Sequence, residues 1–349
     1  MAMNPYHYAV VVGINNYPGW GDLDGPVNDA NDFQEWLVSD GGLPPNNVVP
    51  LTVKKSGQNI NEAEPIKHQV DNMLESIHRK MINDTAHDPE ALWRQSRLYV
   101  FLAGHGIMPR AGESALMLAN AHPERPENLE TSMYADWYRN HSGIFKEVVF
   151  FADCCRNWCE TAPAGGPPFK VGSPTGSPPV FSLIGYACAP ARPAYEHKEG
   201  PPDERRGYFT RALLRGLRGA AAIDPDEGVI TLKTLSPYVI SAVEHATKDK
   251  PFPQAVSWPS SDSGYSLRFS APSAAPLSKV LVHFPPGFAR PVSLLRPDGT
   301  RDSWALAPRP WLLDLPDGRY SITETQPGSV DSFAQEGLFS VFGDCDVQL

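Results

Sequence analysis

Residues 98–103 read LYVFLA and precede Gly104-His105-Gly106, and residues 148–152 read VVFFA and precede Asp153-Cys154-Cys155. Short runs rich in β-branched and aromatic residues are typical of fully buried strands. Side by side in a parallel sheet, these two strands would bring an imidazole and a thiol to the same edge, where open α/β sheets bind ligands. A neighbouring base lets a thiol ionise and act as a nucleophile. The pattern therefore predicts a cysteine protease.

Composition limits the classes of function. Of the 349 residues 41% are hydrophobic and 20% are charged, which is typical of a globular chain that can hold a large α/β domain and a small one. The net charge of −10 argues against nucleic acid as a partner and favours basic substrates. Because the chain has no apolar run of about 18 residues and no signal peptide at its start, we expect no membrane partner and a cytoplasmic location.

Strand-like and helix-like segments alternate up to about residue 270. Further strands are predicted at 8–12, 47–53 and 180–186, and helices at 26–37, 66–81, 129–140, 208–217 and 232–246. This alternation predicts an α/β fold with a mainly parallel central sheet covered on both faces. Two stretches interrupt the alternation and are expected to be mobile, because residues 157–179 are rich in Pro, Gly, Ser and Thr and residues 196–206 are highly charged.

The character of the chain changes after Ser270. Residues 271–276 (APSAAP) read as a linker, and short strand-like runs separated by Pro-Asp-Gly turns follow it. This spacing predicts a small antiparallel, sandwich-like all-β domain at 277–349. Residues 315–320 resemble a turn of small transthyretin-like or PEGA-like modules. We expect the domain to pack against the first one; docking of a regulator is the alternative.

Several motifs together resemble one family. His105 and Cys155 are 50 residues apart, the separation found in caspases. Asp153-Cys154-Cys155 resembles the Asp-[Ser/Cys]-Cys motif of metacaspases and bacterial caspase-like proteases. Four other stretches resemble the same caspase-like cysteine peptidases: YAVVVGINNY at 8–17, GPVNDA at 25–30, GYACA at 185–189 and GYFTRALL at 207–214.

The resemblance implies a caspase-like three-layer fold and a division of the chain. A peptidase domain at 1–270 would comprise a large-subunit-like part at 1–160, a mobile loop at 161–179 and a small-subunit-like part at 180–270. Bacterial relatives suggest a role in stress or antiviral defence, an implication that rests on fold-level analogy.

Two adjacent cysteines compete for the role of nucleophile. In the family pattern the residue after Asp-[Ser/Cys] attacks, which implies Cys155. Adjacent side chains on a strand point to opposite faces, so only one of the two can serve. The alternative is that each is a small buried hydrophobic residue, as free cysteines often are. We expect Cys159 and Cys188 to be bystanders, and no metal site, because the spacing is not that of a Cys-x-x-Cys knuckle.

The resemblance also assigns roles to three residues beside the dyad. The N–H of Gly106, with that of Cys155, would form an oxyanion hole; the alternative is a turn glycine. Asp153 and Asp29 match aspartates that line the S1 pocket and select Arg or Lys at P1, because carboxylates hold a guanidinium bidentately. For Asp29, a role at the positive end of its helix is the alternative.

These assignments predict an endopeptidase that uses a His105–Cys155 dyad without a third acid or a cofactor. Cys155 would attack the carbonyl after Arg or Lys, and His105 would protonate the leaving amine and activate water. Calcium dependence is not expected, because the acidic residues between the two motifs are scattered singly. The rival hypothesis is a catalytically silent caspase-like scaffold that binds a partner protein.

The two expected mobile stretches contain or adjoin basic residues, namely Arg156, Lys170, Lys198, Arg205 and Arg206. Caspase-like zymogens are often cut in such loops, so the resemblance suggests that the protein clips itself or is clipped by an activating protease. A solvated flexible loop is the alternative. The chain departs from the family after the nucleophile, where Arg156-Asn157-Trp158 replaces the usual His-Ser-Gly.

Overall fold

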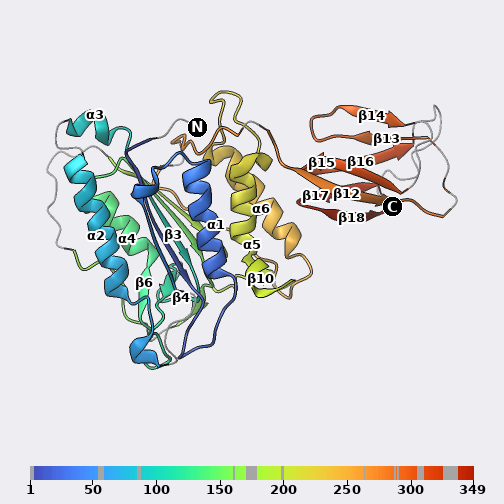
Figure 1. Ribbon diagram of the computed structural model, residues 1–349. Coiled ribbons are helices and arrows are strands. Elements are labelled where there is room, and N and C mark those ends of the chain that lie inside the picture. The colour runs from blue at the N-terminus through green and yellow to red at the C-terminus, as the bar shows by residue number, and fades with distance from the viewer. Residues whose placement is uncertain are drawn as a thin grey trace. The chain divides into compact units, whose positions relative to one another are not determined.

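The computed structural model describes residues 4–53, 59–84, 88–159, 162–169, 179–197, 200–262, 264–272, 274–286, 288, 291–304, 310–324 and 337–349. The chain forms two compact units (Figure 1). The first comprises residues 1–217 and 223–271, and the second comprises residues 218–222 and 272–349.

Five parallel strands form the central sheet of the first unit, in the order β2-β1-β3-β7-β9 (Figure 1). Their bounds are β1 (His7–Ile14), β2 (Val48–Val53), β3 (Arg97–Ala103), β7 (Glu147–Asp153) and β9 (Phe181–Tyr186). The predicted α/β fold with a parallel central sheet is therefore confirmed. The strand that precedes the histidine motif, β3, is the direct neighbour of the strand that precedes the cysteine motif, β7.

Helices cover both faces of this sheet, as Figure 1 shows. Their bounds are α1 (Pro26–Ser39), α2 (Lys67–Asp84), α3 (Pro89–Trp93), α4 (Thr131–Trp137), α5 (Tyr208–Arg215) and α6 (Leu232–Ala246). Side chains alternate along each strand, so Phe101 of β3 stacks on Phe33 of α1 with ring centroids 4.6 Å apart, whereas its neighbour Val100 lies in the opposite core with Leu74 of α2 and Tyr134 of α4. The result is the expected three-layer arrangement.

Short elements complete the first unit. They are the strands β4 (Gly106–Met108), β5 (Ala115–Met117), β6 (Asn128–Glu130), β8 (Asn157–Trp158), β10 (Glu196–His197) and β11 (Arg206–Gly207), the 3-10 turns Pro45–Asn47, Ile60–Glu62 and Pro202–Glu204, and the π-helical turn Tyr138–Ser142. The first four strands form a sheet in the order β6-β5-β4-β8, and β10 pairs with β11. Among the described helices, none has the length and apolarity needed to cross a bilayer.

Two local predictions were wrong. The helix expected from Leu129 begins at Thr131, because residues 128–130 pair with β5 as a strand. The charged stretch at 196–206 was expected to be mobile, but its described residues include the β10–β11 hairpin. Two of its charges are paired: Arg205 forms an ion pair with Asp24, and Arg206 forms one with Asp32 of α1. A run of charges that looks solvated in the sequence is thus tied to the start of α1.

The loop expected at 161–179 is only partly described. Within it, the Gly165 carbonyl accepts from the Glu130 N–H at 3.0 Å, and the Pro163 carbonyl accepts from the Asn128 side chain at 3.0 Å. Residue 161 and residues 170–178 lie outside the described residues.

The second unit is a small β-sandwich with sheets β15-β12-β18 and β14-β13-β16-β17. Its strands are β12 (Leu277–His283), β13 (Val292–Leu295), β14 (Arg301–Trp304), β15 (Trp311–Pro316), β16 (Gly318–Glu324), β17 (Leu338–Val341) and β18 (Cys345–Gln348). The two sheets share one core, in which Trp311 and Val280 lie with Tyr320 and Ile322.

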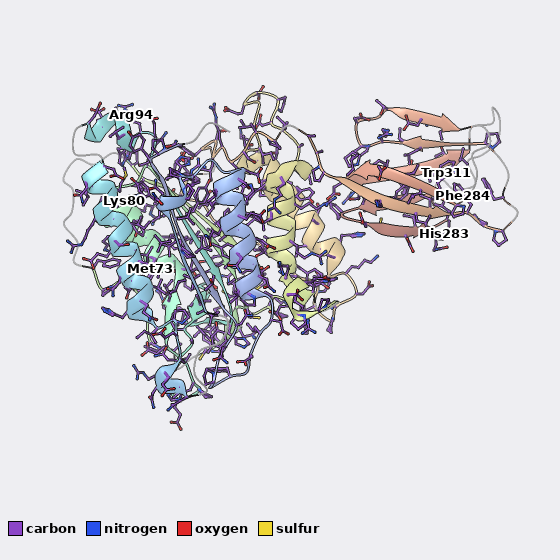
Figure 2. All side chains as sticks on the ribbon, viewed as in Figure 1. Met73, Lys80, Arg94, His283, Phe284 and Trp311 are labelled. Carbon is purple, nitrogen blue, oxygen red and sulfur yellow. The ribbon has the colours of Figure 1, made fainter. Side chains whose placement is uncertain are left out.

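At one side of this core Phe284 packs edge-on against Trp311, with ring centroids 4.7 Å apart (Figure 2). The expected all-β C-terminal region is confirmed, with one correction to its topology. The β12–β18 pairing is parallel, so the sandwich is not purely antiparallel. The last strand, β18, pairs with β12 and runs in the same direction. The Pro-Asp-Gly turns do not indicate this parallel pairing.

Candidate active site

The register of β3 and β7 brings the histidine and cysteine motifs to the same level. Ala103 pairs with Asp153 at the ends of these strands, and His105 and Cys155 each follow two residues later. Both side chains line one cavity of about 110 Å³ at the carboxyl edge of the sheet. Open parallel sheets bind ligands at this edge. The cavity is therefore the candidate active site.

The walls of this cavity come from five separate parts of the chain. It is lined by Leu23, Pro26, Asp29, Gly104, His105, Asp153, Cys154, Cys155, Ala194, Tyr195, Glu196 and Gly207. Each residue to which the sequence assigned a catalytic or specificity role lines the cavity, except Gly106, which lies directly beside Cys155.

His105 is oriented by a backbone carbonyl. Its Nε2 lies 2.9 Å from the carbonyl oxygen of Gly21. Because a carbonyl oxygen only accepts, Nε2 carries the proton and Nδ1 is left as the free base. Burial lowers the pKa of His105 below its ordinary value, so the ring is neutral at pH 7. The predicted dyad without a third acid thus includes an orienting group that no side-chain motif could reveal.

The thiol of Cys155 is held by the backbone of one residue. Its Sγ accepts from the N–H of Ala194 at 3.3 Å and donates to the carbonyl of Ala194 at 3.4 Å. Burial raises the pKa of this thiol above its ordinary value, so it is protonated at rest. No hydrogen bond joins Cys155 to His105 within the described part of the chain. The two groups share a cavity, and the thiol has to leave Ala194 before the imidazole can take its proton.

Cys154 and Cys155 both follow the end of β7, and their side chains differ in burial. The side chain of Cys154 is buried in the core, where Sγ lies 3.6 Å from the hydroxyl of Ser114, and burial raises the pKa of this thiol to about 12. Cys188 is also buried, and Cys159 packs against the same core. Two cysteines line the cavity, and of these Cys154 is buried whereas Cys155 is partly exposed.

Two buried aspartates form one wall of the cavity. Asp153 accepts from the hydroxyl of Thr210 at 2.6 Å and from its N–H at 3.1 Å, and Asp29 accepts from the N–H of Gly207 at 2.9 Å. Burial raises the pKa of Asp153 to about 6. Burial, and then the charge of Asp153, raise the pKa of Asp29 well above its ordinary value. Asp29 also lies in the first turn of α1, so the alternative role at the positive end of its helix stays open beside the bond to Gly207.

Gly207 is required at this wall. A Cβ added there would lie 2.1 Å from Asp153 Oδ2, so any side chain would displace the carboxylate. Because Gly207 has no side chain, its backbone lies against the Asp153 carboxylate. Its N–H donates to Asp29. One glycine therefore sets the positions of both carboxylates.

Glu196 is a third carboxylate of the cavity, and the sequence analysis missed it. It lies on β10, and its Oε1 accepts from the N–H of Gly25 at 2.9 Å. Its charge contributes to raising the pKa of Asp29, Asp153 and Cys155. Glu196 belongs to a charged run that resembled a solvated loop. One feature of the sequence could have indicated Glu196. The charged run follows the strand-like segment at 180–186, and ligands bind at the carboxyl ends of strands in this class of fold.

Gly106 makes a close contact with both cysteines. A Cβ at this position would lie 2.2 Å from the carbonyl oxygen of Cys155 and 2.7 Å from the Cβ of Cys154. Gly106 pairs with Leu116 across β4 and β5, and the Met117 N–H donates to the His105 carbonyl beside this pair at 2.9 Å. In such a ladder the N–H of Gly106 points away from β5, toward the side of β4 on which β8 lies.

Arg156 does not fit its suggested role as a cleavage site. Its side chain is buried, donates to the carbonyls of Glu113 at 3.2 Å and Cys188 at 3.1 Å, and lies 4.3 Å from the ring centre of Tyr186. A protease could not bind it without unfolding this region. Arg156 instead fixes the chain directly after Cys155. Lys170 and Lys198 lie outside the described residues.

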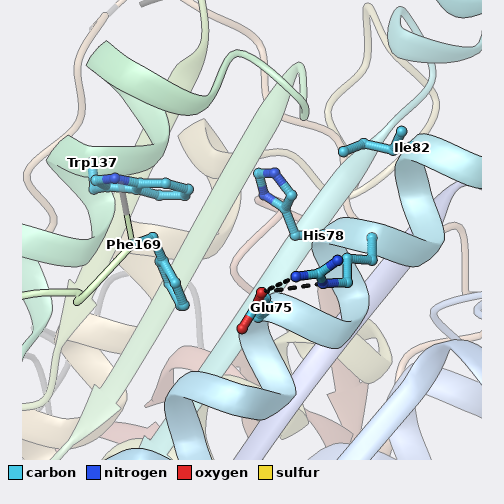
Figure 3. A pocket seen from close by; sticks show the side chains of 6 residues that line it. Glu75, His78, Ile82, Trp137 and Phe169 are labelled. Carbon is cyan, nitrogen blue, oxygen red and sulfur yellow. Dashed lines mark hydrogen bonds and ion pairs between the residues drawn. The ribbon is translucent and has the colours of Figure 1, made fainter. Parts of the chain in front are cut away.

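A second, larger cavity of about 400 Å³ lies between α2 and α4 (Figure 3). Figure 3 shows its aromatic side chains, Trp137 and Phe169, across from His78 and Glu75. Glu75 forms an ion pair with Arg79, which also lines the cavity. It contains no nucleophile. Among the described residues no group of three or more His, Cys, Asp or Glu side chains is placed to hold a metal ion. Of these two cavities, the smaller one is lined by cysteine together with histidine.

Comparison with known proteins supports this assignment at the level of the family. A family model described as the caspase domain matches residues 6–261. A probable protease from a Desulfuromonadales bacterium is 32% identical over 238 residues, which cover 61% of this chain. The match covers 26% of that relative, so the chain spans about a quarter of the relative's length.

Two solved structures are also similar over 77% of this chain. A protein from Geobacter sulfurreducens has a TM-score of 0.46 and 14% identity, with 99% of its chain covered. Caspase-1 from Spodoptera frugiperda has a TM-score of 0.46 and 15% identity, with 93% of its chain covered. On the family match over residues 6–261, this chain belongs to the caspase-domain family.

Proposed function

We propose that this protein is a cysteine endopeptidase that cleaves protein substrates after Arg or Lys, with Cys155 as the nucleophile and His105 as the general base and acid. The observation that carries the proposal is the shared cavity of Cys155 and His105 beside buried carboxylates. A thiol, a neutral imidazole with a free Nδ1 and an acidic pocket are the groups that this reaction needs.

The reaction begins when a substrate displaces the Cys155 thiol from Ala194. Nδ1 of His105 takes the thiol proton, and the thiolate attacks the carbonyl carbon of the scissile bond. The imidazolium that forms is stabilised by the Nε2–H bond to the Gly21 carbonyl. His105 then gives its proton to the leaving amine. In the second half it activates a water that hydrolyses the thioester and restores the thiol.

The oxyanion of the tetrahedral intermediate would be bound by the N–H groups of Gly106 and Cys155. Two observations support Gly106 in this role. Its backbone lies against Cys155, because it has no Cβ, and its N–H points away from β5. A preorganised donor of this kind typically lowers the barrier by about 3 kcal/mol.

The acidic wall favours a basic P1 side chain. Asp29, Asp153 and Glu196 line the same small cavity as the thiol, so a guanidinium or ammonium group there would find up to three carboxylates. A substrate aspartate would meet like charges and also the cost of burial. Asp153 and Asp29 are therefore proposed as substrate-binding residues, together with Glu196.

We further propose that residues 1–270 act as the peptidase domain and that residues 277–349 bind a regulator. Cleavage of the chain after a basic residue, by itself or by an activating protease, would be one way to free the thiol from Ala194. Arg205 and Arg206 are candidate positions for such a cut, and they form ion pairs with Asp24 and Asp32.

Fluorogenic peptides that differ only in P1 test the proposal. The wild-type protein should release fluorophore from the Arg and Lys peptides at least a hundredfold faster than from the Asp peptide, and Cys155→Ala should release none. Cys154→Ala is the matched control and should keep most of the activity, because its side chain faces the core. Equal background release by wild type and Cys155→Ala, before and after limited trypsin treatment, would instead favour a silent scaffold.

A further inference from the structure

We propose that Tyr17 is the positioning residue for His105, which it holds at two points at once; this inference rests on the proposed role of His105 as the base. Tyr17 follows β1 and is fully buried. It is the last residue of the stretch 8–17 and lies outside the histidine and cysteine motifs. Its contacts nevertheless lead to the imidazole from two directions.

The hydroxyl of Tyr17 makes the first of these contacts. It accepts from the backbone N–H of His105 at 3.0 Å and donates to the carbonyl of Met117 at 3.1 Å. The N–H of Met117 donates in turn to the carbonyl of His105 at 2.9 Å. These three bonds form a closed loop that fixes the backbone of His105 against β5. The hydroxyl is therefore both donor and acceptor at a place where water has no access.

The backbone of Tyr17 makes the second contact. Its carbonyl accepts from the N–H of Gly21 at 2.9 Å, and its own N–H donates to the side chain of Asp22 at 2.9 Å. These bonds close the turn that presents the Gly21 carbonyl to Nε2 of His105. The same residue thus fixes the backbone of His105 and the acceptor that selects its tautomer.

The ring of Tyr17 adds a steric limit. It packs edge-on against the imidazole, with ring centroids 4.7 Å apart. Room for its hydroxyl comes from Gly104, where an added Cβ would lie 2.2 Å from that oxygen at a backbone φ of +157°. The glycine before His105 therefore has a specific purpose, which is to admit the Tyr17 hydroxyl.

The test is Tyr17→Phe, which removes the hydroxyl and keeps the ring and the backbone bonds to Gly21 and Asp22. We expect kcat for an Arg peptide to fall tenfold to a hundredfold with KM unchanged, because a small displacement of a catalytic group costs about this much. The lost hydroxyl bonds to His105 and Met117, not to the acidic wall proposed to bind P1. Gly104→Ala should have at least the same effect, since its methyl group would displace that hydroxyl.

An NMR titration of the His105 ring supplies a readout that does not depend on turnover. In the wild type this ring should titrate below the ordinary value of histidine, because it is buried. The charges of Asp22 and Glu196 act in the opposite direction and raise the pKa of His105, and none of the substitutions removes them. In Tyr17→Phe the ring should be less confined and more hydrated, so its midpoint should move upward, toward about 6.5. His105→Gln assigns the resonance.

Tyr134→Phe is the matched control. It removes another buried tyrosine hydroxyl, which donates to Asp71 at 2.5 Å away from the cavity, and it should change neither kcat nor the titration of His105. An unchanged His105 titration in Tyr17→Phe, or a change equal to that in Tyr134→Phe, would overturn the inference whatever the protein cleaves. A shifted titration in a protein that cleaves no peptide would uphold the positioning of His105 and reject the proposed function.

Discussion

Ala194 contacts the sulfur of Cys155 with both polar groups of its backbone, through an N–H at 3.3 Å and a carbonyl at 3.4 Å. The thiol is thus hydrogen-bonded as a thiol, and its S–H proton has an acceptor other than His105. Because the His105 ring is neutral and hydrogen-bonded to Gly21, the resting site is not a thiolate–imidazolium pair. This arrangement has a direct consequence for the reactivity of the free protein.

Alkylation of Cys155 by iodoacetamide should be slow at neutral pH and should accelerate as the pH rises above 8. The reactive species is the thiolate, and burial raises the pKa of this thiol above its ordinary value. Peptide mapping identifies the modified residue, and Cys155→Ala supplies the blank. A rate that is already constant between pH 5 and 7 would show a preformed ion pair and contradict the neutral resting state.

Asp153→Asn should remove the preference for basic P1 residues. The variant keeps an oxygen that can accept from Thr210 but loses the charge, so kcat/KM for an Arg peptide should fall about a hundredfold. Most of the loss should lie in KM. Glu196→Gln should have a smaller effect, because Glu196 is only partly buried. Equal kcat/KM values for wild type and Asp153→Asn would place the P1 pocket elsewhere.

The same carboxylates should make folding stability depend on pH. Burial raises the pKa of Asp153 from its ordinary 3.8 to about 6, so the folded state binds this proton more tightly than the unfolded state. The protonated Asp153 carboxyl therefore stabilises the folded state fully below pH 4, and this stabilisation is lost as the pH rises through 6. Asp153→Asn should consequently gain on the order of 2 kcal/mol over wild type between pH 4 and 7.

Urea unfolding of both proteins at several pH values measures this difference. Asp71→Asn is a suitable control, because Asp71 is also buried but accepts from Tyr134 and pairs with Lys67. That variant should lose stability. If the difference in free energy of unfolding between Asp153→Asn and the wild type stays constant across this pH range, the raised pKa of Asp153 is refuted.

Processing of the chain should avoid Arg156. Intact masses of wild type and Cys155→Ala, purified side by side, show whether the protein clips itself. If fragments form only in the wild type, their new ends should follow other basic residues, since the side chain of Arg156 is buried. Identical single masses for the two proteins would reject self-cleavage, and a cut after Arg156 would contradict the folded environment described above.

Much of the fold could be predicted because its signals are local. The apolar runs that precede His105 and Cys155 are β3 and β7, and apolar spacing predicted α6 over its full length, residues 232–246. The placement of both side chains at one edge followed from two facts, that the strands are parallel and that they are neighbours.

The parts that could not be predicted depend on contacts between distant segments. The Gly21 carbonyl that orients His105 is a backbone group, which leaves no mark in a side-chain pattern. Glu196 belongs to a charged run whose ion pairs with α1 arise only after folding. The parallel pairing of β12 with β18 depends on the path of the last strand, which turn residues do not encode.

The central claim is that Cys155, assisted by His105, is the nucleophile that attacks peptide carbonyls. Incubation with a peptidyl-arginine fluoromethyl ketone, followed by peptide mapping, tests this claim most directly. We predict a single adduct on Cys155 in the wild type, none in Cys155→Ala, and labelling slowed at least a hundredfold in His105→Ala. An adduct on Cys154 or Cys159, or labelling that proceeds equally well without His105, would contradict it.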